Sequence, residues 1–134
     1  MDTPAPALPK PGQISWNELT VSNAAIAKHF YTELFGWSSM PFAGTAPVEG
    51  MPPYEMFMAA GVPMPVGGMV QIPYDMPGAW VPYVVVANVD EALAKALALG
   101  AAICAPVMEV QTVGRIAVVQ DPSGARIGLH ELAK

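Results

Sequence analysis

The sequence predicts an α+β fold in which two tandem βαβββ modules form a curved mixed sheet around a cup-shaped cavity. The first observation is a match between "LTVSN" at 19–23 and "VVVAN" at 84–88, an offset of about 65 residues. The second is that the helical segment after each match ends at a glycine, Gly36 or Gly100. Each module can bury its helix on one sheet face, so the opposite faces, curved by sheet twist, can close around a cavity.

The 134 residues suit a single domain of residues 13–134, preceded by an extended arm, residues 1–12, that holds four prolines. Module one is expected at about 13–73 and module two at about 80–132. Whether the modules pair within one chain or exchange across a dimer looks the same in the sequence.

In module one, a β-rich segment at 13–21 leads to a helix that Ser22 or Asn23 can cap. The apolar residues of this helix form two adjacent rows, namely Ile26, Phe30 and Leu34, and Ala27, Tyr31 and Phe35. Strands are expected to begin at 37 and to cover 54–61 and 66–73. Glycine and proline within 43–72 leave the register of this stretch open.

In module two, a strand from 80 leads to a helix that Asn88 or Asp90 can cap. A short strand follows at 102–110, and two strands at 115–120 and 125–132 close the domain as a hairpin. Asp-Pro-Ser-Gly at 121–124 has proline and glycine where a tight turn favours them.

The composition indicates a covered surface and excludes some partners. Apolar residues make up 53% of the chain and charged residues only 13%, which favours a homodimer interface or a lined cavity. The net charge of −5, with six Lys and Arg in all, argues against binding to nucleic acid or anionic membranes.

The sequence shows neither a signal peptide nor a bilayer-spanning segment, so a cytoplasmic protein is expected. The one cysteine, Cys104, lies in an apolar run and is expected to be a buried thiol.

Two longer motifs resemble a known superfamily. "FYTELFGW" at 30–37 in the first helix and "GRIAVVQDPSGARIGL" at 114–129 are similar to the vicinal oxygen chelate superfamily of glyoxalases, bleomycin resistance proteins and extradiol dioxygenases. The resemblance covers residues 12–132. "W-x-E-L" from Trp16 and "W-x-x-Y" from Trp80 look like a glyoxalase-like bacterial branch.

For its metalloenzymes, the resemblance implies that the first and last strands of each module supply His, Gln or Glu ligands to a divalent cation. The corresponding positions are Trp16, Val81 and Gly128, and the fourth falls near Gln71. A lone amide cannot hold such a cation, so we expect no cofactor and no metal.

A displaced site for a divalent metal, built from His130, Glu18 and Gln71, is the alternative to a metal-free cup. His130 lies two residues beyond the superfamily's Glu position and therefore on the same strand face.

Glu18 is the candidate catalytic residue. It shares a strand face with Trp16, and burial against the indole would raise the pKa of its carboxyl and suit it to general-base work or to a cationic or hydroxyl-bearing ligand. The alternative is a structural carboxylate that is paired with Arg115 or Arg126 or bonded to nearby backbone. Tyr83, which matches Glu18 in module two, either orients a ligand or is a buried tyrosine with one hydrogen bond.

Trp16, Trp80, His130 and Arg126 are further candidates, and each also has a structural alternative. Trp16 and Trp80 form an aromatic clamp or fill the core; His130 acts as an acid or base, or faces solvent or a subunit contact. Arg126 neutralises a ligand carboxylate or forms a surface ion pair. The predicted ligand-binding set is Trp16, Glu18, Gln71, Trp80, Tyr83, Arg126 and His130.

The function expected from these patterns is binding of a small molecule by a homodimer of the glyoxalase and bleomycin-resistance type, without the metal site. One alternative is a metal-dependent or Glu-based lyase or isomerase, or a dioxygenase-like enzyme. A further alternative is an interaction module whose cavity is filled by its own side chains. The sequence identifies no ligand.

Overall fold

The computed structural model describes residues 8–42, 50, 52–73 and 77–134. The expected loop at 43–53 and the first seven residues of the arm therefore lie largely outside the described residues. Among the described residues, no helix is both long enough and apolar enough to cross a membrane.

In the described part of the chain, two helices and eight strands form one curved, unclosed mixed sheet, as the repeat predicts. The strand order is β2-β3-β4-β1-β5-β8-β7-β6. The strands are β1 Ile14–Val21, β2 Ser38–Pro41, β3 Glu55–Met58, β4 Gly67–Gln71, β5 Ala79–Val85, β6 Ala102–Val110, β7 Gly114–Gln120 and β8 Arg126–Leu132.

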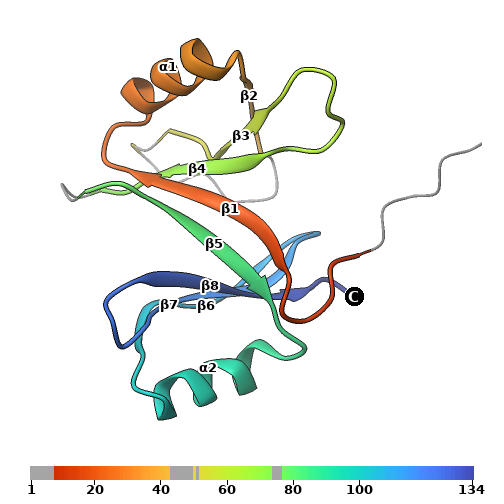
Figure 1. Ribbon diagram of the computed structural model, residues 1–134, viewed down its shortest axis with the longest axis vertical. Coiled ribbons are helices and arrows are strands. Elements are labelled where there is room, and N and C mark those ends of the chain that lie inside the picture. Colours follow the sequence, from red (N-terminus) through yellow and green to blue (C-terminus); the bar gives the residue numbers. More distant parts are fainter. Residues whose placement is uncertain (1–7, 43–49, 51, 74–76) are drawn as a thin grey trace, which may run out of the picture.

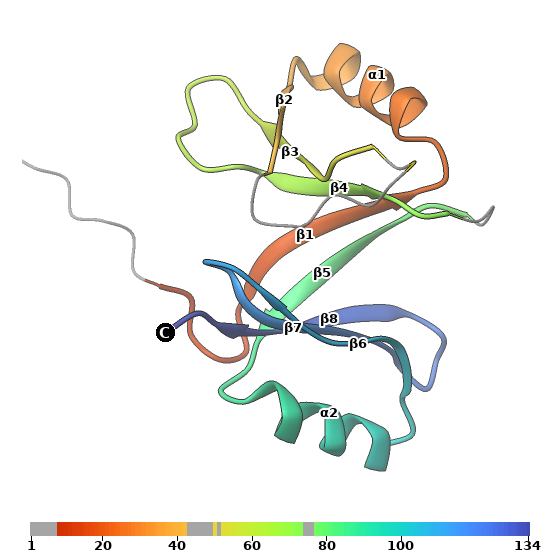
Figure 2. The same cartoon turned by 180° about the vertical axis from the view of Figure 1, so that it is seen from behind.

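The two modules pair within one chain. β1 pairs antiparallel with β5 at the centre, and each of these strands pairs in parallel with the last strand of its own module, β4 or β8. Helices α1 (Ala24–Phe35) and α2 (Val89–Ala98) cover the two ends of the sheet, and β1 and β5 run obliquely between these ends (Figures 1 and 2). Both helices lie on the convex side, so the opposite, concave face is free of them.

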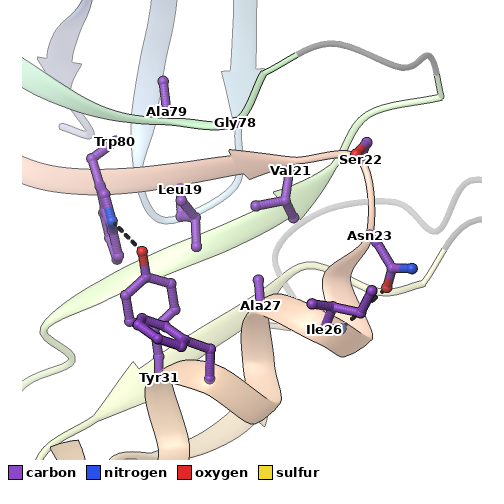
Figure 3. A pocket seen from close by; sticks show the side chains of 11 residues that line it. Leu19, Val21, Ser22, Asn23, Ile26, Ala27, Tyr31, Gly78, Ala79 and Trp80 are labelled. Carbon is purple, nitrogen blue, oxygen red and sulfur yellow. Dashed lines mark hydrogen bonds between the residues drawn. The ribbon is translucent and has the colours of Figure 1, made fainter. Parts of the chain in front are cut away.

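Only one of the two apolar rows of α1 packs inward. Ala27 and Tyr31 point from the helix towards β1 and Trp80 (Figure 3), and both pack on a core of Leu19, Ala24, Phe57 and Met69. The row of Ile26, Phe30 and Leu34 faces outward and is exposed.

Each helix begins at the asparagine that the sequence indicates. The side chain of Asn23 accepts a hydrogen bond from Ile26 N, and the side chain of Asn88 accepts one from Glu91 N. Gly36 ends α1 in the left-handed conformation, with φ of 70°.

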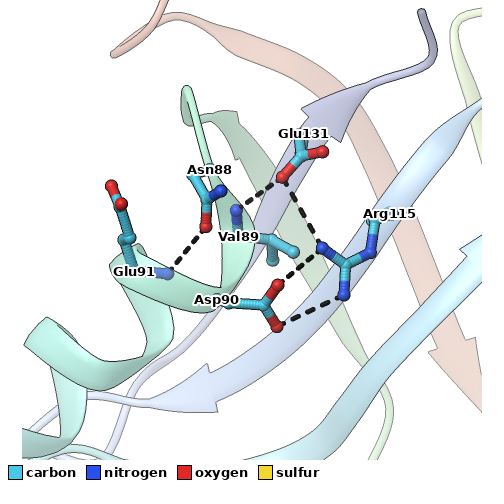
Figure 4. A network of polar contacts seen from close by, with 6 residues as sticks. All are labelled: Asn88, Val89, Asp90, Glu91, Arg115 and Glu131. Atoms are coloured by element: carbon cyan, nitrogen blue, oxygen red, sulfur yellow. Dashed lines mark hydrogen bonds and ion pairs between the residues drawn. The ribbon is translucent and has the colours of Figure 1, made fainter.

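In each module, a side chain of the last strand accepts a hydrogen bond from the backbone N–H of the first helical residue. Gln71 Oε1 accepts from Ala24 N at 2.9 Å, and Glu131 Oε1 accepts from Val89 N at 2.9 Å (Figure 4). The backbone N–H groups of a first helical turn have no partner within the helix, so these bonds satisfy donors that would otherwise need water. Gln71 therefore acts at the helix and not on the concave face.

Cys104 is exposed, so the prediction of a buried thiol was wrong. It lies on β6, which is the edge strand of the sheet and has a neighbour on one side only. The closing hairpin is as predicted: Asp121 Oδ1 accepts hydrogen bonds from Ser123 N and Ala125 N within its turn.

We predict that Gln71→Ala lowers the free energy of unfolding by about 1 kcal/mol, because it leaves the Ala24 N–H without its side-chain acceptor. Urea denaturation followed by circular dichroism measures the change. Gln111→Ala, at an exposed position beyond β6, is the matched control. Equal losses in the two variants would contradict the capping role.

Candidate functional site

The register of the central strands places the candidate residues on the concave face. Trp16 of β1 lies opposite Tyr83 of β5, and Glu18 lies opposite Val81. Directly opposed residues point to the same side of a sheet, so these four side chains share one face. Leu19, the next residue of β1, packs under α1 on the other side.

A tyrosine pair holds the Glu18 carboxyl. The Tyr83 hydroxyl donates to Glu18 Oε2 at 2.8 Å, and the Tyr54 hydroxyl is a second hydrogen-bond partner of this carboxyl. Trp16 Nε1 in turn donates to the Tyr54 hydroxyl at 2.8 Å. The result is a connected polar network in the middle of the concave face.

Burial raises the pKa of Glu18 above its ordinary value of 4.5, although the hydrogen bonds from Tyr83 and Tyr54 act in the opposite direction. Burial also raises the pKa values of both tyrosines, and the negative charge of Glu18 adds to this effect. Both hydroxyls therefore remain protonated donors, which leaves the carboxylate as the acceptor of the network.

Arg115 is not the partner of Glu18. Its guanidinium donates to both carboxylate oxygens of Asp90, at 2.6 and 3.2 Å, and lies 3.9 Å from Glu131 (Figure 4). This network lies at the N-terminal end of α2, on the helix side of the sheet, so the alternative in which Glu18 pairs with Arg115 does not hold. The two groups that lower the pKa of Glu18 are hydroxyls.

Two glycines make room for the two tyrosines. A Cβ atom on Gly68 would collide with the Tyr54 hydroxyl and ring, and one on Gly128 would collide with the Tyr83 ring. Gly68 pairs with Glu18, and Gly128 pairs with Tyr83, so the two glycines hold equivalent places in the two modules. Each tyrosine ring rests directly on the backbone of a last strand.

Comparison with known proteins gives the same fold and named relatives. No family model matches the sequence. The chain is 33% identical over 123 residues to "Putative glyoxylase CFP32" of Mycobacterium bovis, a match that covers 90% of this chain and 46% of that protein. It is 29% identical over 128 residues to "Anthracycline biosynthesis protein DauV" of Streptomyces sp. strain C5. This match covers 86% of this chain and 45% of that protein.

Methylmalonyl-CoA epimerase from Mycobacterium tuberculosis has the same fold at 12% identity, with a TM-score of 0.58 over 92% of this chain and 89% of that one. These relatives and fold neighbours fit the vicinal oxygen chelate superfamily that the sequence resembles. An extradiol ring-cleaving dioxygenase from B. fuscum, another fold neighbour, has a TM-score of 0.58 at 18% identity, over 99% of this chain and 36% of the dioxygenase. This chain spans about half the length of the curated relatives it matches.

The ligand positions implied by the vicinal oxygen chelate resemblance do not fit a metal here. The register moves the fourth position from the vicinity of Gln71, where the sequence placed it, to Gly68, since Gly68 is the counterpart of Gly128. Trp16, Val81 and two glycines supply no oxygen, sulfur or imidazole donor. Among the described residues, no group of three or more His, Cys, Asp and Glu side chains could hold a metal ion.

The displaced metal site is also not assembled. His130 is buried, and its two ring nitrogens are engaged, Nδ1 with Ser15 Oγ at 2.8 Å and Nε2 with the Val113 carbonyl at 2.7 Å. The expectation of a solvent-facing His130 was therefore wrong. Gln71 caps α1, so neither residue joins Glu18.

Trp80 lies on the other side of the sheet from Trp16, so the two do not form an aromatic clamp, and Trp80 takes the core-filling role that was the alternative. Its indole N–H donates to the Tyr31 hydroxyl at 3.0 Å, and its ring packs with Tyr31, Trp37 and Phe57 below α1. Adjacent residues of a strand alternate between faces, and Trp80 is paired with Leu19. Arg126 lies opposite Gln120, on the same strand face as Gly128.

Sequence reasoning missed Tyr54, whose hydroxyl joins Trp16 to Glu18. The alternation of Tyr54, Met56 and Met58 gives them one face and was the available signal, but the glycines and prolines around it obscured the register. Ser15 was missed because the pairing of β1 with β5 shifts register between Ile14 and Trp16.

We predict that the stability of the wild type falls relative to Glu18→Gln as the pH rises from about 4.5. The folded protein binds the Glu18 proton more tightly than the unfolded chain does, so ionisation of Glu18 destabilises the folded state above the ordinary pKa. Urea unfolding across a pH series measures the difference. In a Tyr83→Phe background the fall should begin at the same pH but extend to higher pH, because that hydroxyl lowers the pKa in the folded state. A difference independent of pH would contradict the effect of burial.

Proposed function

We propose that the chain binds an apolar small molecule on the concave face and that the Glu18 carboxyl fixes its orientation. The observation that supports this proposal is the buried carboxyl held by Tyr83 and Tyr54 in the middle of that face. A buried carboxyl is unfavourable for folding unless other interactions compensate for it, so a site of this kind in a concave surface is typical of ligand recognition.

The cytoplasmic location expected from the sequence stays a prediction.

The surroundings of Glu18 favour a ligand with an apolar body and a hydroxyl or amine group. Val81 lies opposite the carboxyl, and the register places Met56 and Val118 beside the two glycines. An amine or hydroxyl can donate to the acceptor that the tyrosines leave available on Glu18. The name of the Streptomyces relative, an anthracycline biosynthesis protein, supports a polycyclic aromatic ligand of this kind.

We predict that doxorubicin, an anthracycline with an amino sugar, binds the wild type and that Glu18→Gln weakens binding by about tenfold, because a charge-assisted hydrogen bond is lost. Titration followed by the fluorescence of doxorubicin measures both affinities. Glu109→Gln, which removes an exposed carboxylate on β6, is the matched control and should bind as the wild type does. Equal affinities of Glu18→Gln and the wild type would exclude Glu18 from the site.

The raised pKa of Glu18 favours a second candidate function, proton abstraction by Glu18 as a general base in an isomerase or lyase. Methylmalonyl-CoA, the compound for which one fold neighbour is named, is a suitable probe because its α-carbon carries an acidic proton. An enzyme of this class would accelerate deuterium incorporation at that carbon in D2O, as seen by NMR. Glu18→Gln would abolish the acceleration, whereas a binding protein would show none.

We predict that the purified protein contains far less than one divalent metal per chain and that EDTA leaves its melting temperature unchanged. Both expectations follow because Trp16, Val81, Gly68 and Gly128, which stand at the four ligand positions, supply no side-chain donor for a metal. Mass spectrometric metal analysis and thermal unfolding with added Zn2+, Mn2+ or Fe2+ measure them. Stoichiometric metal would contradict the metal-free proposal.

A further inference from the structure

Arg126 is the one basic residue that a strand places on the concave face, and all six Lys and Arg of the chain lie in its described part. It shares a strand face with Gly128, whose backbone meets the Tyr83 ring on the concave side. The other arginine, Arg115, lies opposite Glu131 in the closing hairpin and faces the helices. The four lysines belong to the helices or to segments outside the strands. An acid group bound on the concave face therefore has Arg126 as its basic partner among the strand residues.

Arg126 and Glu18 lie in one row across the concave face. Glu18 is opposite Val81 in the pairing of β1 with β5. Val81 and Arg126 each come two residues before a member of the next pair, which joins Tyr83 of β5 to Gly128 of β8. Two strand spacings, about 10 Å, therefore separate the backbones of Glu18 and Arg126 where the strands stay paired. Towards their N-terminal ends β5 and β8 diverge, which widens this separation (Figures 1 and 2).

The two charged groups are held by different contacts. Hydrogen bonds from Tyr83 and Tyr54, and not Arg126, lower the pKa of Glu18. A guanidinium carries five N–H donors, so Arg126 can bind a carboxylate in addition to the contacts that it already makes. The concave face thus presents an acceptor on β1 and a cationic donor on β8, with β5 between them.

We propose that the ligand of the concave face carries a carboxylate at the end opposite to its hydroxyl or amine group, and that Arg126 binds this carboxylate. The inference rests on the proposed function and adds to it an acid group and the residue that selects it. A planar guanidinium holds a carboxylate by two parallel hydrogen bonds, so the contact fixes the direction of the ligand as well as its charge. The apolar body of the ligand then spans β5.

The charge of the chain makes this contact selective. The net charge of −5 repels an anion from the molecule as a whole, so binding of an acid requires a local positive charge. Arg126 supplies that charge and is itself partly buried, whereas charged side chains are mostly exposed. An ion pair that is partly shielded from water is also stronger than one on an open surface.

Two probes that differ only in the acid group test the proposal. 2-Naphthol has an apolar body and a hydroxyl, and 6-hydroxy-2-naphthoate adds a carboxylate at the far end of the same ring system. We expect the wild type to bind 6-hydroxy-2-naphthoate about tenfold more tightly in isothermal titration calorimetry, because a charge-assisted hydrogen bond is gained. Added NaCl should reduce this preference and leave the affinity for 2-naphthol unchanged, because salt screens the ion pair.

Variants of the two arginines locate the contact. Arg126→Gln should weaken binding of 6-hydroxy-2-naphthoate by about tenfold and leave 2-naphthol binding unchanged. Arg115→Gln, the matched control on the helix side of the hairpin, should change neither affinity. Arg126→Lys keeps the charge without the planar fork and should retain part of the preference, which separates loss of charge from loss of folding. Circular dichroism spectra show that each variant is folded.

Equal affinities of the wild type for the two probes, or a preference for the acid that survives in Arg126→Gln, would overturn the proposal. Doxorubicin, which has no carboxylate, tests the proposed function separately. Doxorubicin binding that depends on Glu18, together with no preference for the acid, would reject the role of Arg126 and leave the proposed function standing. Failure of all three compounds to bind would reject the proposed function and this inference with it.

Discussion

The antiparallel pairing of β1 with β5 is the constraint on which the site depends. It joins the two modules into one sheet and sets the register that brings Glu18 and Tyr83 to the same face. A shift of one residue would turn Glu18 towards the core below α1 and Leu19 towards the concave face, because strand side chains alternate. The same strand pairing therefore determines both the polar network on the concave face and the apolar core below α1.

Duplication of one module explains why the two halves of the sheet share several local features. Both modules have an asparagine at the start of the helix, a side chain of the last strand that accepts from the first helical N–H, and a glycine in that strand. They differ where the neighbouring residues differ. Gln71 is an amide in module one, whereas its counterpart Glu131 is charged and also lies near Arg115. The outward faces of the helices also differ in part, since exposed Ile26 and Phe30 of α1 have Glu91 and Lys95 as their counterparts on α2.

The sequence predicted the repeat, the helix caps and the closing hairpin because these depend on residues close together in the chain. It placed Glu18 and Tyr83 at equivalent positions of the two modules but did not predict the hydrogen bond between them. It failed for Trp80, Gln71 and His130, whose roles depend on partners far away in sequence, such as Ser15 and Val113. Tyr54 was missed because local pattern cannot set a register through a stretch rich in glycine and proline.

The contact between the Tyr83 ring and the Gly128 backbone limits which side chains position 128 can carry. A carboxylate side chain at position 128, which is where the metalloenzymes of the superfamily place a ligand, would need the space that the ring fills. The ring and such a ligand exclude each other, so no single substitution at this position converts one kind of cup into the other. A side chain at position 128 therefore also requires a smaller residue, or a displaced ring, at position 83.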